Sequence, residues 1–92
     1  MANLCHVTTS EAAAAERLAG DPFLHCCTEA QLGFVLARHF AGRSGLVVLR
    51  FDPACIEGEI RWERSEPGQD PFPHLYGALP VAATTASPAP GG

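Results

Sequence analysis

The sequence predicts an α+β fold, with two short N-terminal helices packed against a mixed, mostly antiparallel sheet. The helix-forming patterns all lie before residue 42, whereas short apolar and β-branched runs separated by turn residues follow. The chain has 92 residues, which is enough for one domain. We therefore expect a single α+β domain over residues 1–85. A Pro/Gly/Ala-rich tail over residues 86–92 is expected to be disordered.

The first half of the chain reads as strand, helix, strand and helix. Residues 4–8 end in a β-branched pair, which is typical of a strand. Thr9 and Ser10 can cap a first helix that runs through the alanines to about residue 19, before Gly20. Residues 23–26 form a short second strand.

A second helix is predicted to begin at Thr28. Gln31 lies three residues after it, which is the spacing of a capping box. Gly42 ends the helix. The apolar stripe of this helix consists of Leu32, Val35, Leu36, His39 and Phe40.

The second half of the chain is predicted to be strands and loops. Residues 46–51 are apolar on both faces, so this strand should be central. Residues 60–63 alternate, which predicts that Ile60 and Trp62 point inward. A polar loop over 65–73, an extended segment over 74–77 and a last edge strand over 81–85 complete the predicted elements.

Charge and hydropathy exclude several classes of partner. The formal net charge is −4, and the six basic residues are scattered arginines without a lysine. This distribution lacks the basic stripe typical of nucleic-acid binding. No apolar run approaches the roughly 20 residues of a membrane helix, and the N-terminus does not resemble a signal peptide. We expect a cytoplasmic protein, a monomer or weak dimer, whose four cysteines are thiols.

The histidines are the first candidates for a functional site. His6, His25 and His74 lie at or near predicted strand ends, where sites are often built. If neighbouring strands carry them, their rings line one cleft. The alternative for each is a packed or hydrogen-bonded imidazole, and this is the interpretation adopted for His39.

Glu63 and Tyr76 are the other candidates. Glu63 ends the strand over 60–63 and, as a carboxylate, can act as a base or stabilise a cationic transition state. The alternative is a solvated ion pair with Arg61 or Arg64. Tyr76 can stack on a planar ligand or pack in the core or at its rim.

No metal site is predicted. The cysteines and histidines form neither a C-x-x-C nor an H-x-x-x-H pair. Cys26 and Cys27 are neighbours in a predicted strand and so face opposite sides. Walker, G-x-G-x-x-G and G-x-S-x-G motifs are also absent from the sequence.

The chain resembles a bacterial family of unknown function, the domain of unknown function numbered 952. The family motifs H-[IV]-T-T, F-[IL]-H-C-S-T, R-W-E and F-P-H-L-Y-G-x-L-P have counterparts in the same order along the chain. Those counterparts are Leu4–Thr9, Phe23–Thr28, Arg61–Glu63 and Phe72–Pro80. The resemblance covers about residues 3–82. Cys27 replaces the family's serine, and the first helix is unusually rich in alanine.

The resemblance implies a compact relative of the ADP-ribosyltransferase fold, whose enzymes hold NAD in a cleft between two small sheets. By this analogy, His6 and Thr8 bind the ligand on the first strand and His25 shapes the nicotinamide pocket. Glu63 stabilises the oxocarbenium-like transition state, with His74 as the rival candidate. Fold does not fix function, however.

Three classes of function therefore stay open. The first is an enzyme that binds NAD or a similar nucleotide in a histidine-rich cleft and transfers ADP-ribose. The second is a non-catalytic binding module that uses the same cleft for a small molecule or a protein. The third is a small structural or interaction protein with packed histidines.

Overall fold

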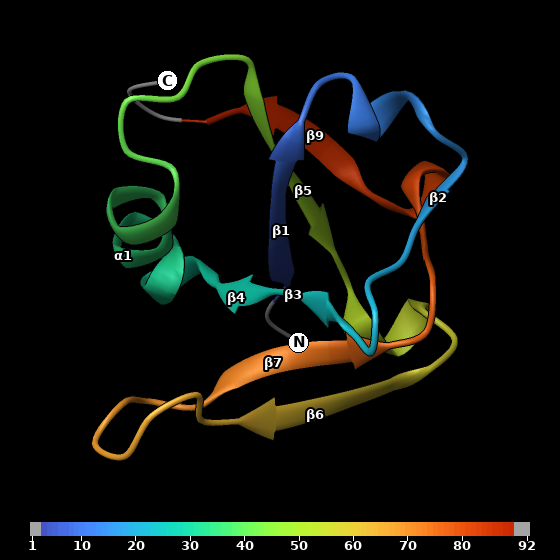
Figure 1. Ribbon diagram of the computed structural model, residues 1–92. Helices are drawn as coiled ribbons and strands as arrows, with labels where there is room; N and C mark the ends of the chain where they lie inside the picture. Colours follow the sequence, from blue (N-terminus) through green and yellow to red (C-terminus); the bar gives the residue numbers. More distant parts are fainter. Residues whose placement is uncertain (1–2, 90–92) are drawn as a thin grey trace.

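In the computed structural model, which describes residues 3–89, one α-helix packs against strands arranged in three antiparallel sheets (Figure 1). The first sheet has four strands. Its inner strands are β1 (Leu4–Thr9) and β5 (Leu46–Phe51), flanked by β4 (Cys27–Thr28) and β9 (Thr85–Pro88). The interior place of β5 confirms the central strand predicted from its apolar run.

The second and third sheets are smaller. A three-stranded sheet orders β3 (Leu24–His25), β7 (Phe72–Tyr76) and β6 (Glu59–Glu63). A two-stranded ribbon pairs β2 (Arg17–Leu18) with β8 (Leu79–Pro80). Short 3₁₀ turns lie at Ala12–Ala14, Pro53–Cys55 and Val81–Ala83.

The helix α1 (Glu29–His39) begins at the predicted cap. The Thr28 hydroxyl accepts a hydrogen bond from the Gln31 backbone N–H at 3.1 Å, and the Gln31 side chain accepts one from the Thr28 N–H at 3.0 Å. The same Gln31 side chain donates to the Pro71 carbonyl at 3.0 Å, which ties the helix to the loop before β7. The capping box is therefore confirmed, and it also fixes the position of the helix.

Two apolar clusters lie on opposite faces of the four-stranded sheet. Alternate residues of β1 divide between them, since Cys5 and Val7 face α1 while Leu4 faces the three-stranded sheet. On β5, Val48 belongs to the first cluster and Phe51 to the second. Within residues 3–89, no helix is long and apolar enough to span a bilayer.

The expectation of two N-terminal helices is wrong, and with it the predicted fold class. Residues 12–14 form only a 3₁₀ turn, and Arg17 and Leu18 then enter the β2–β8 ribbon. A short isolated helix is marginal in water unless an apolar face packs against a core. The alanine-rich segment supplies only Leu18 as a large apolar anchor, so pairing with β8 is preferred.

The prediction that Trp62 is buried with Ile60 is also wrong. Ile60 packs against the cluster around Phe51, but Trp62 on the same face of β6 is 53% exposed. β6 is the edge of its sheet, and alternation predicts burial only where another layer covers the strand.

The C-terminal prediction needs a correction too. Val81–Ala83 form a 3₁₀ turn rather than a strand, and β9 at Thr85–Pro88 pairs with β5, although all of it except Thr85 falls in the segment expected to be disordered. Ala89 is buried in the first cluster. The rest of the expected tail, residues 90–92, lies outside the described residues.

Candidate functional site

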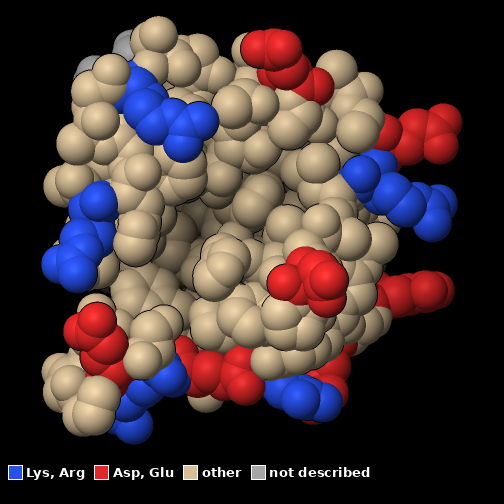
Figure 2. Space-filling view, viewed as in Figure 1, with Lys and Arg blue, Asp and Glu red and all other residues tan. Residues whose placement is uncertain are grey.

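A cleft opens where the chain passes from the three-stranded to the four-stranded sheet. This passage takes place between His25 on β3 and Cys27 on β4. β4 pairs with β1 only at Leu4 and Cys5, so β4 does not continue beside the rest of β1. Figure 2 shows the resulting hollow in the middle of one face, with no charged side chain visible in its deepest part.

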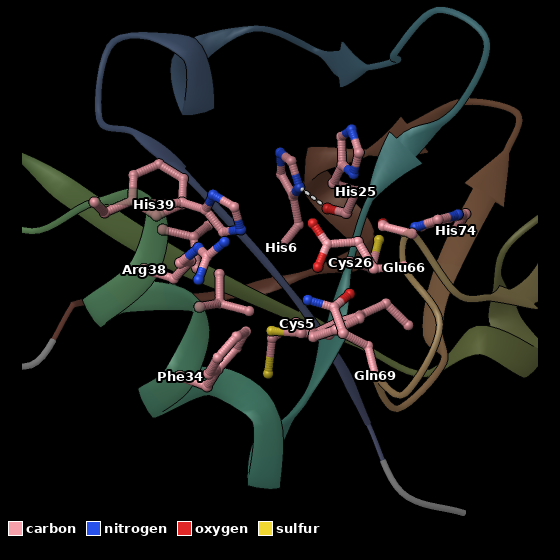
Figure 3. A pocket seen from close by; sticks show the side chains of 16 residues that line it. Cys5, His6, His25, Cys26, Phe34, Arg38, His39, Glu66, Gln69 and His74 are labelled. Atoms are coloured by element: carbon pink, nitrogen blue, oxygen red, sulfur yellow. Dashed lines mark hydrogen bonds between the residues drawn. The ribbon is translucent and has the colours of Figure 1, made fainter.

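The cleft has a volume of about 450 Å³, within the range typical of small-molecule sites. Its inner wall, as we name it, consists of His6 on β1, His25 on β3 and His74 on β7. Its rim comprises α1 and the β6–β7 loop, and the rim residues are Phe34, Arg38, His39, Glu66 and Gln69. Figure 3 shows these side chains around the opening. The remainder of the lining consists of Ser65 and of cysteines and apolar residues, namely Cys5, Val7, Cys26, Cys27, Val35, Phe40 and Phe72.

His6 is held by the backbone of the neighbouring strand. Its Nδ1 lies 2.6 Å from the carbonyl oxygen of His25, and because a carbonyl only accepts, Nδ1 carries the proton (Figure 3). Burial lowers the pKa of His6; the hydrogen bond to the His25 carbonyl opposes this lowering, and the proximity of the His25 ring adds to it. His6 is therefore neutral near pH 7, with a basic Nε2.

His74 is held by a carboxylate. Its Nδ1 lies 2.8 Å from Glu63 Oε1, and the Tyr76 hydroxyl donates to the same oxygen at 2.7 Å. Hydrogen bonds from Tyr76 and then from His74 lower the pKa of Glu63, so the carboxylate is ionised near pH 7. This arrangement leaves Nε2 as the unoccupied nitrogen of His74.

Aromatic packing orients two of the rings. Phe23 stacks on His74 with a centroid distance of 3.9 Å and an interplanar angle of 13°. The same Phe23 ring meets His25 edge-on at 4.8 Å, and the His25 and His74 rings are 5.4 Å apart. Burial, followed by the proximity of His74 and His39, lowers the pKa of His25.

The rim is held less firmly than the inner wall. Phe34 is 48% exposed and lies 6.2 Å from the Phe72 ring, centroid to centroid. Within residues 3–89, Arg38 forms no ion pair, although Glu66 lines the same cleft. The rim therefore offers a cation and an aromatic ring to a ligand.

The predicted site residues separate into two groups. The structure brings His6, His25 and His74 together in one cleft, whereas Thr8, Glu63 and Tyr76 are not among its lining residues. Thr8 is partly buried in β1, in register with Val47. Tyr76 lies under Arg61, whose guanidinium carbon is 4.3 Å from the ring centroid.

Glu63 is not the partner of an arginine that the alternative interpretation proposed. Arg61 pairs with Glu59 at 3.0 Å, and Arg64 donates to the Gln69 carbonyl at 2.7 Å. Glu63 instead bonds to His74 and Tyr76, its neighbours on the same face of the β6–β7 pair. It meets the cleft only through His74.

Sequence reasoning missed the rim residues of α1. His39 was placed in the apolar stripe of the helix, but it is exposed and lines the cleft with Arg38. One signal was available, because Phe34 and Arg38 lie four residues apart, as do Val35 and His39, so all four share one side of the helix. Among residues 3–89, no group of three or more His, Cys, Asp or Glu side chains is arranged to hold a metal ion.

Comparison with known proteins gives a family and a fold. The family described as "Protein of unknown function (DUF952)" matches residues 2–87. The crystal structure of protein CC0527 from Caulobacter crescentus is similar, with a TM-score of 0.79 and 27% identity over 94% of this chain and 84% of that one. A double mutant of CC0527 matches with a TM-score of 0.78, at the same identity and coverage. No curated protein matches the chain. These comparisons support the family, while the expected likeness to ADP-ribosyltransferases finds no support in them.

Proposed function

The chain belongs to the DUF952 family, which carries no activity in its description, and we propose its function from the cleft: it binds a small nucleotide-type molecule and transfers a proton on it through His74. The observation that carries this proposal is the position of His74. It lines the cleft and has its Nδ1 engaged by an ionised carboxylate. A histidine held in this way is a typical general acid or base.

The residues around His74 suit a planar, polar ligand. His6 and His25 present imidazoles with lowered pKa values, so they accept or donate hydrogen bonds without adding full charges. Phe34 at the rim can stack on a base or a pyridine ring. Arg38 can bind a phosphate or carboxylate. NAD and ADP-ribose contain these groups and are the candidate ligands, with only part of either molecule inside the cleft.

Glu63 acts through His74 in this proposal. Its Oε1 already accepts two hydrogen bonds, and the side chain does not line the cleft. Glu63 is therefore a positioning residue, which keeps the proton on Nδ1 of His74 and leaves Nε2 to exchange a proton with the ligand. Tyr76 holds the other side of the carboxylate.

The position of Glu63 outside the cleft favours a second candidate, a binding module without turnover. An ADP-ribosyl transfer through an oxocarbenium-like state needs a carboxylate or dipole facing the ribose. Glu66, on the rim, is the carboxylate that lines the cleft. If its loop does not approach the ligand, the cleft binds nucleotides without cleaving the glycosidic bond.

Calorimetric titration with NAD, ADP-ribose and nicotinamide, combined with an assay for nicotinamide release, tests the proposal. We expect saturable binding of NAD or ADP-ribose, abolished or strongly weakened by His25→Ala. Nicotinamide release identifies the enzyme, and binding without release identifies the binding module. The absence of binding for all three compounds contradicts the nucleotide assignment.

Two carboxylates on one strand give a matched control for proton transfer. Glu63→Gln removes the charge that positions His74, whereas Glu59→Gln removes a carboxylate whose partner is Arg61, an exposed residue. We expect Glu63→Gln to lower turnover and alter its pH profile, and Glu59→Gln to leave both unchanged. Equal turnover in the two variants would remove Glu63 from the proposed mechanism.

A further inference from the structure

Two cysteines lie opposite each other on neighbouring strands beside the cleft. Cys5 of β1 and Cys27 of β4 are partners in the antiparallel register. Directly paired antiparallel residues have their Cα atoms about 4.5 or about 5.5 Å apart. Both separations fall within the range of about 4.4–6.8 Å that a disulfide spans.

The two thiols also share one face. Cys5 and Cys27 belong to the apolar cluster under α1 and both line the cleft. Cys26, the neighbour of Cys27, belongs to the cluster on the other face and points its thiol toward the Leu24 carbonyl at 3.7 Å. Cys26 is therefore not positioned to pair with Cys5. Cys55, the remaining cysteine, is exposed and lies 3.8 Å from the Asp52 carboxylate.

We propose that Cys5 and Cys27 form a dithiol site in the cleft, which hydroperoxides oxidise to a cross-strand disulfide. The site is independent of the nucleotide proposal, because it requires only the register of β1 and β4 and access through the cleft. Cys5 and Cys27 are 0% and 2% exposed, so the oxidant must be small, and hydrogen peroxide, scarcely larger than water, is the simplest of this class.

Cys27 is the thiol that reacts first. It lies directly before Thr28, the N-cap of an 11-residue helix, and the partial positive charge at that end stabilises a thiolate. The neighbouring Cys5 thiol lowers the pKa of Cys27, although burial acts against this lowering, and the same interaction raises the pKa of Cys5. The carboxylate of Glu29 opposes this effect, but it is engaged by Arg50. Burial raises the pKa of Cys26 to about 12, so Cys26 is less reactive than Cys27.

The reaction has two steps. The Cys27 thiolate attacks one peroxide oxygen, the O–O bond breaks, and a sulfenic acid forms as the other oxygen leaves as hydroxide and becomes water by gaining a proton. The Cys5 sulfur then attacks Cys27 Sγ, and the sulfenic oxygen leaves as a second water with the Cys5 proton. One hydrogen peroxide is reduced to two waters, and the two thiols are oxidised to one disulfide.

The test is a disulfide map of the folded protein after exposure to hydrogen peroxide. The reduced protein is oxidised, quenched, unfolded and alkylated with N-ethylmaleimide, and the peptides are analysed without reduction. We expect one disulfide, Cys5–Cys27, and alkylated Cys26. The same treatment in urea should lose this selectivity, because the register that pairs the two thiols is then absent.

Cysteine variants distinguish the proposed Cys5–Cys27 disulfide from non-specific oxidation of the other thiols. Cys55→Ser, which removes the exposed thiol and its intermolecular cross-links, and Cys26→Ala should both keep the Cys5–Cys27 disulfide. Cys27→Ser should abolish it. The proposal is overturned if Cys5 and Cys27 are both alkylated under conditions that oxidise Cys55, or if a disulfide of the folded protein joins another pair. Because the map of the unchanged protein decides both points, a variant that fails to fold does not affect the test.

Discussion

The inner wall and the rim of the cleft differ in how their side chains are held. His6 and His74 each have one ring nitrogen fixed by a hydrogen bond, and Phe23 packs against His74. The rim has an exposed Phe34 and an Arg38 without an ion pair in residues 3–89. Fixed groups favour chemistry, because positioning is complete before the ligand arrives. Exposed groups without such contacts favour adaptable binding, so the two parts of the cleft should respond differently to substitution.

The largest expected difference is between two histidines. His74→Gln removes the proposed acid or base and should lower kcat by at least about a hundredfold, the lower range for general acid–base catalysis. His39→Gln, on the rim, should raise KM with little change in kcat. Steady-state kinetics of nicotinamide release measure both. Equal losses of kcat in the two variants would mean that the wall and the rim do not differ in role.

A smaller effect is expected at the cation of the rim. Arg38→Gln should weaken binding of ADP-ribose about tenfold, as for the loss of one charge-assisted hydrogen bond. Its melting temperature should not change, because the side chain is exposed and forms no ion pair in the described residues. Arg43→Gln is the control, since Arg43 lies 5.3 Å above the Phe40 ring and does not line the cleft. A similar loss of affinity in both variants would point to net charge instead of a specific contact.

A substitution in the capping box perturbs α1, which carries part of the rim, without changing a residue that lines the cleft. Thr28→Ala should cost about 1 kcal/mol of unfolding free energy, the usual value for an N-cap hydroxyl. Urea denaturation measures this loss, with Thr85→Ala on exposed β9 as the control. If Thr28→Ala is neutral, the helix is held mainly by its apolar contacts and by the bond from Gln31 to Pro71.

The smallest effect is the pH dependence of stability. His6 and His25 have folded-state pKa values below the ordinary 6.5, so the unfolded chain binds more protons just below that pH. Their contribution to stability is complete above about pH 6.5 and is lost as the pH falls through the lower folded values. The melting temperature should therefore decrease between pH 7 and pH 5.5. His6→Gln should flatten this decrease, and an unchanged slope would show that His6 is not desolvated in solution.

Local signals were sufficient for part of the fold. Thr28 and Gln31 predicted the start of α1 because a capping box involves only neighbouring residues. The apolar run over 46–51 predicted an inner strand because consecutive apolar residues show that both faces of the strand are covered. The alanine-rich segment and Trp62 were mispredicted because their structure depends on what packs against them, and no local pattern reports that.

The candidate site was also predictable only in part. His6, His25 and His74 stood out because each lies in a distinctive motif near a strand end, and the fold places all three in the inner wall. The rim depends on how α1 approaches the β6–β7 loop, a tertiary contact, so Arg38 and Glu66 were not predicted. The bonds of Glu63 to His74 and Tyr76 arise from the register of β6 and β7, which the sequence does not specify.

The protonation state of the imidazoles tests most directly whether the inner wall is fixed before a ligand binds. Long-range ¹H–¹⁵N NMR spectra near pH 7 distinguish the two neutral tautomers of each histidine and the charged form. We predict that His6 is neutral with its proton on Nδ1, and that Nδ1 of His74 is protonated, since each nitrogen faces an acceptor oxygen. A His6 ring that is charged or protonated on Nε2, or a His74 ring with an unprotonated Nδ1, would contradict this account of the cleft.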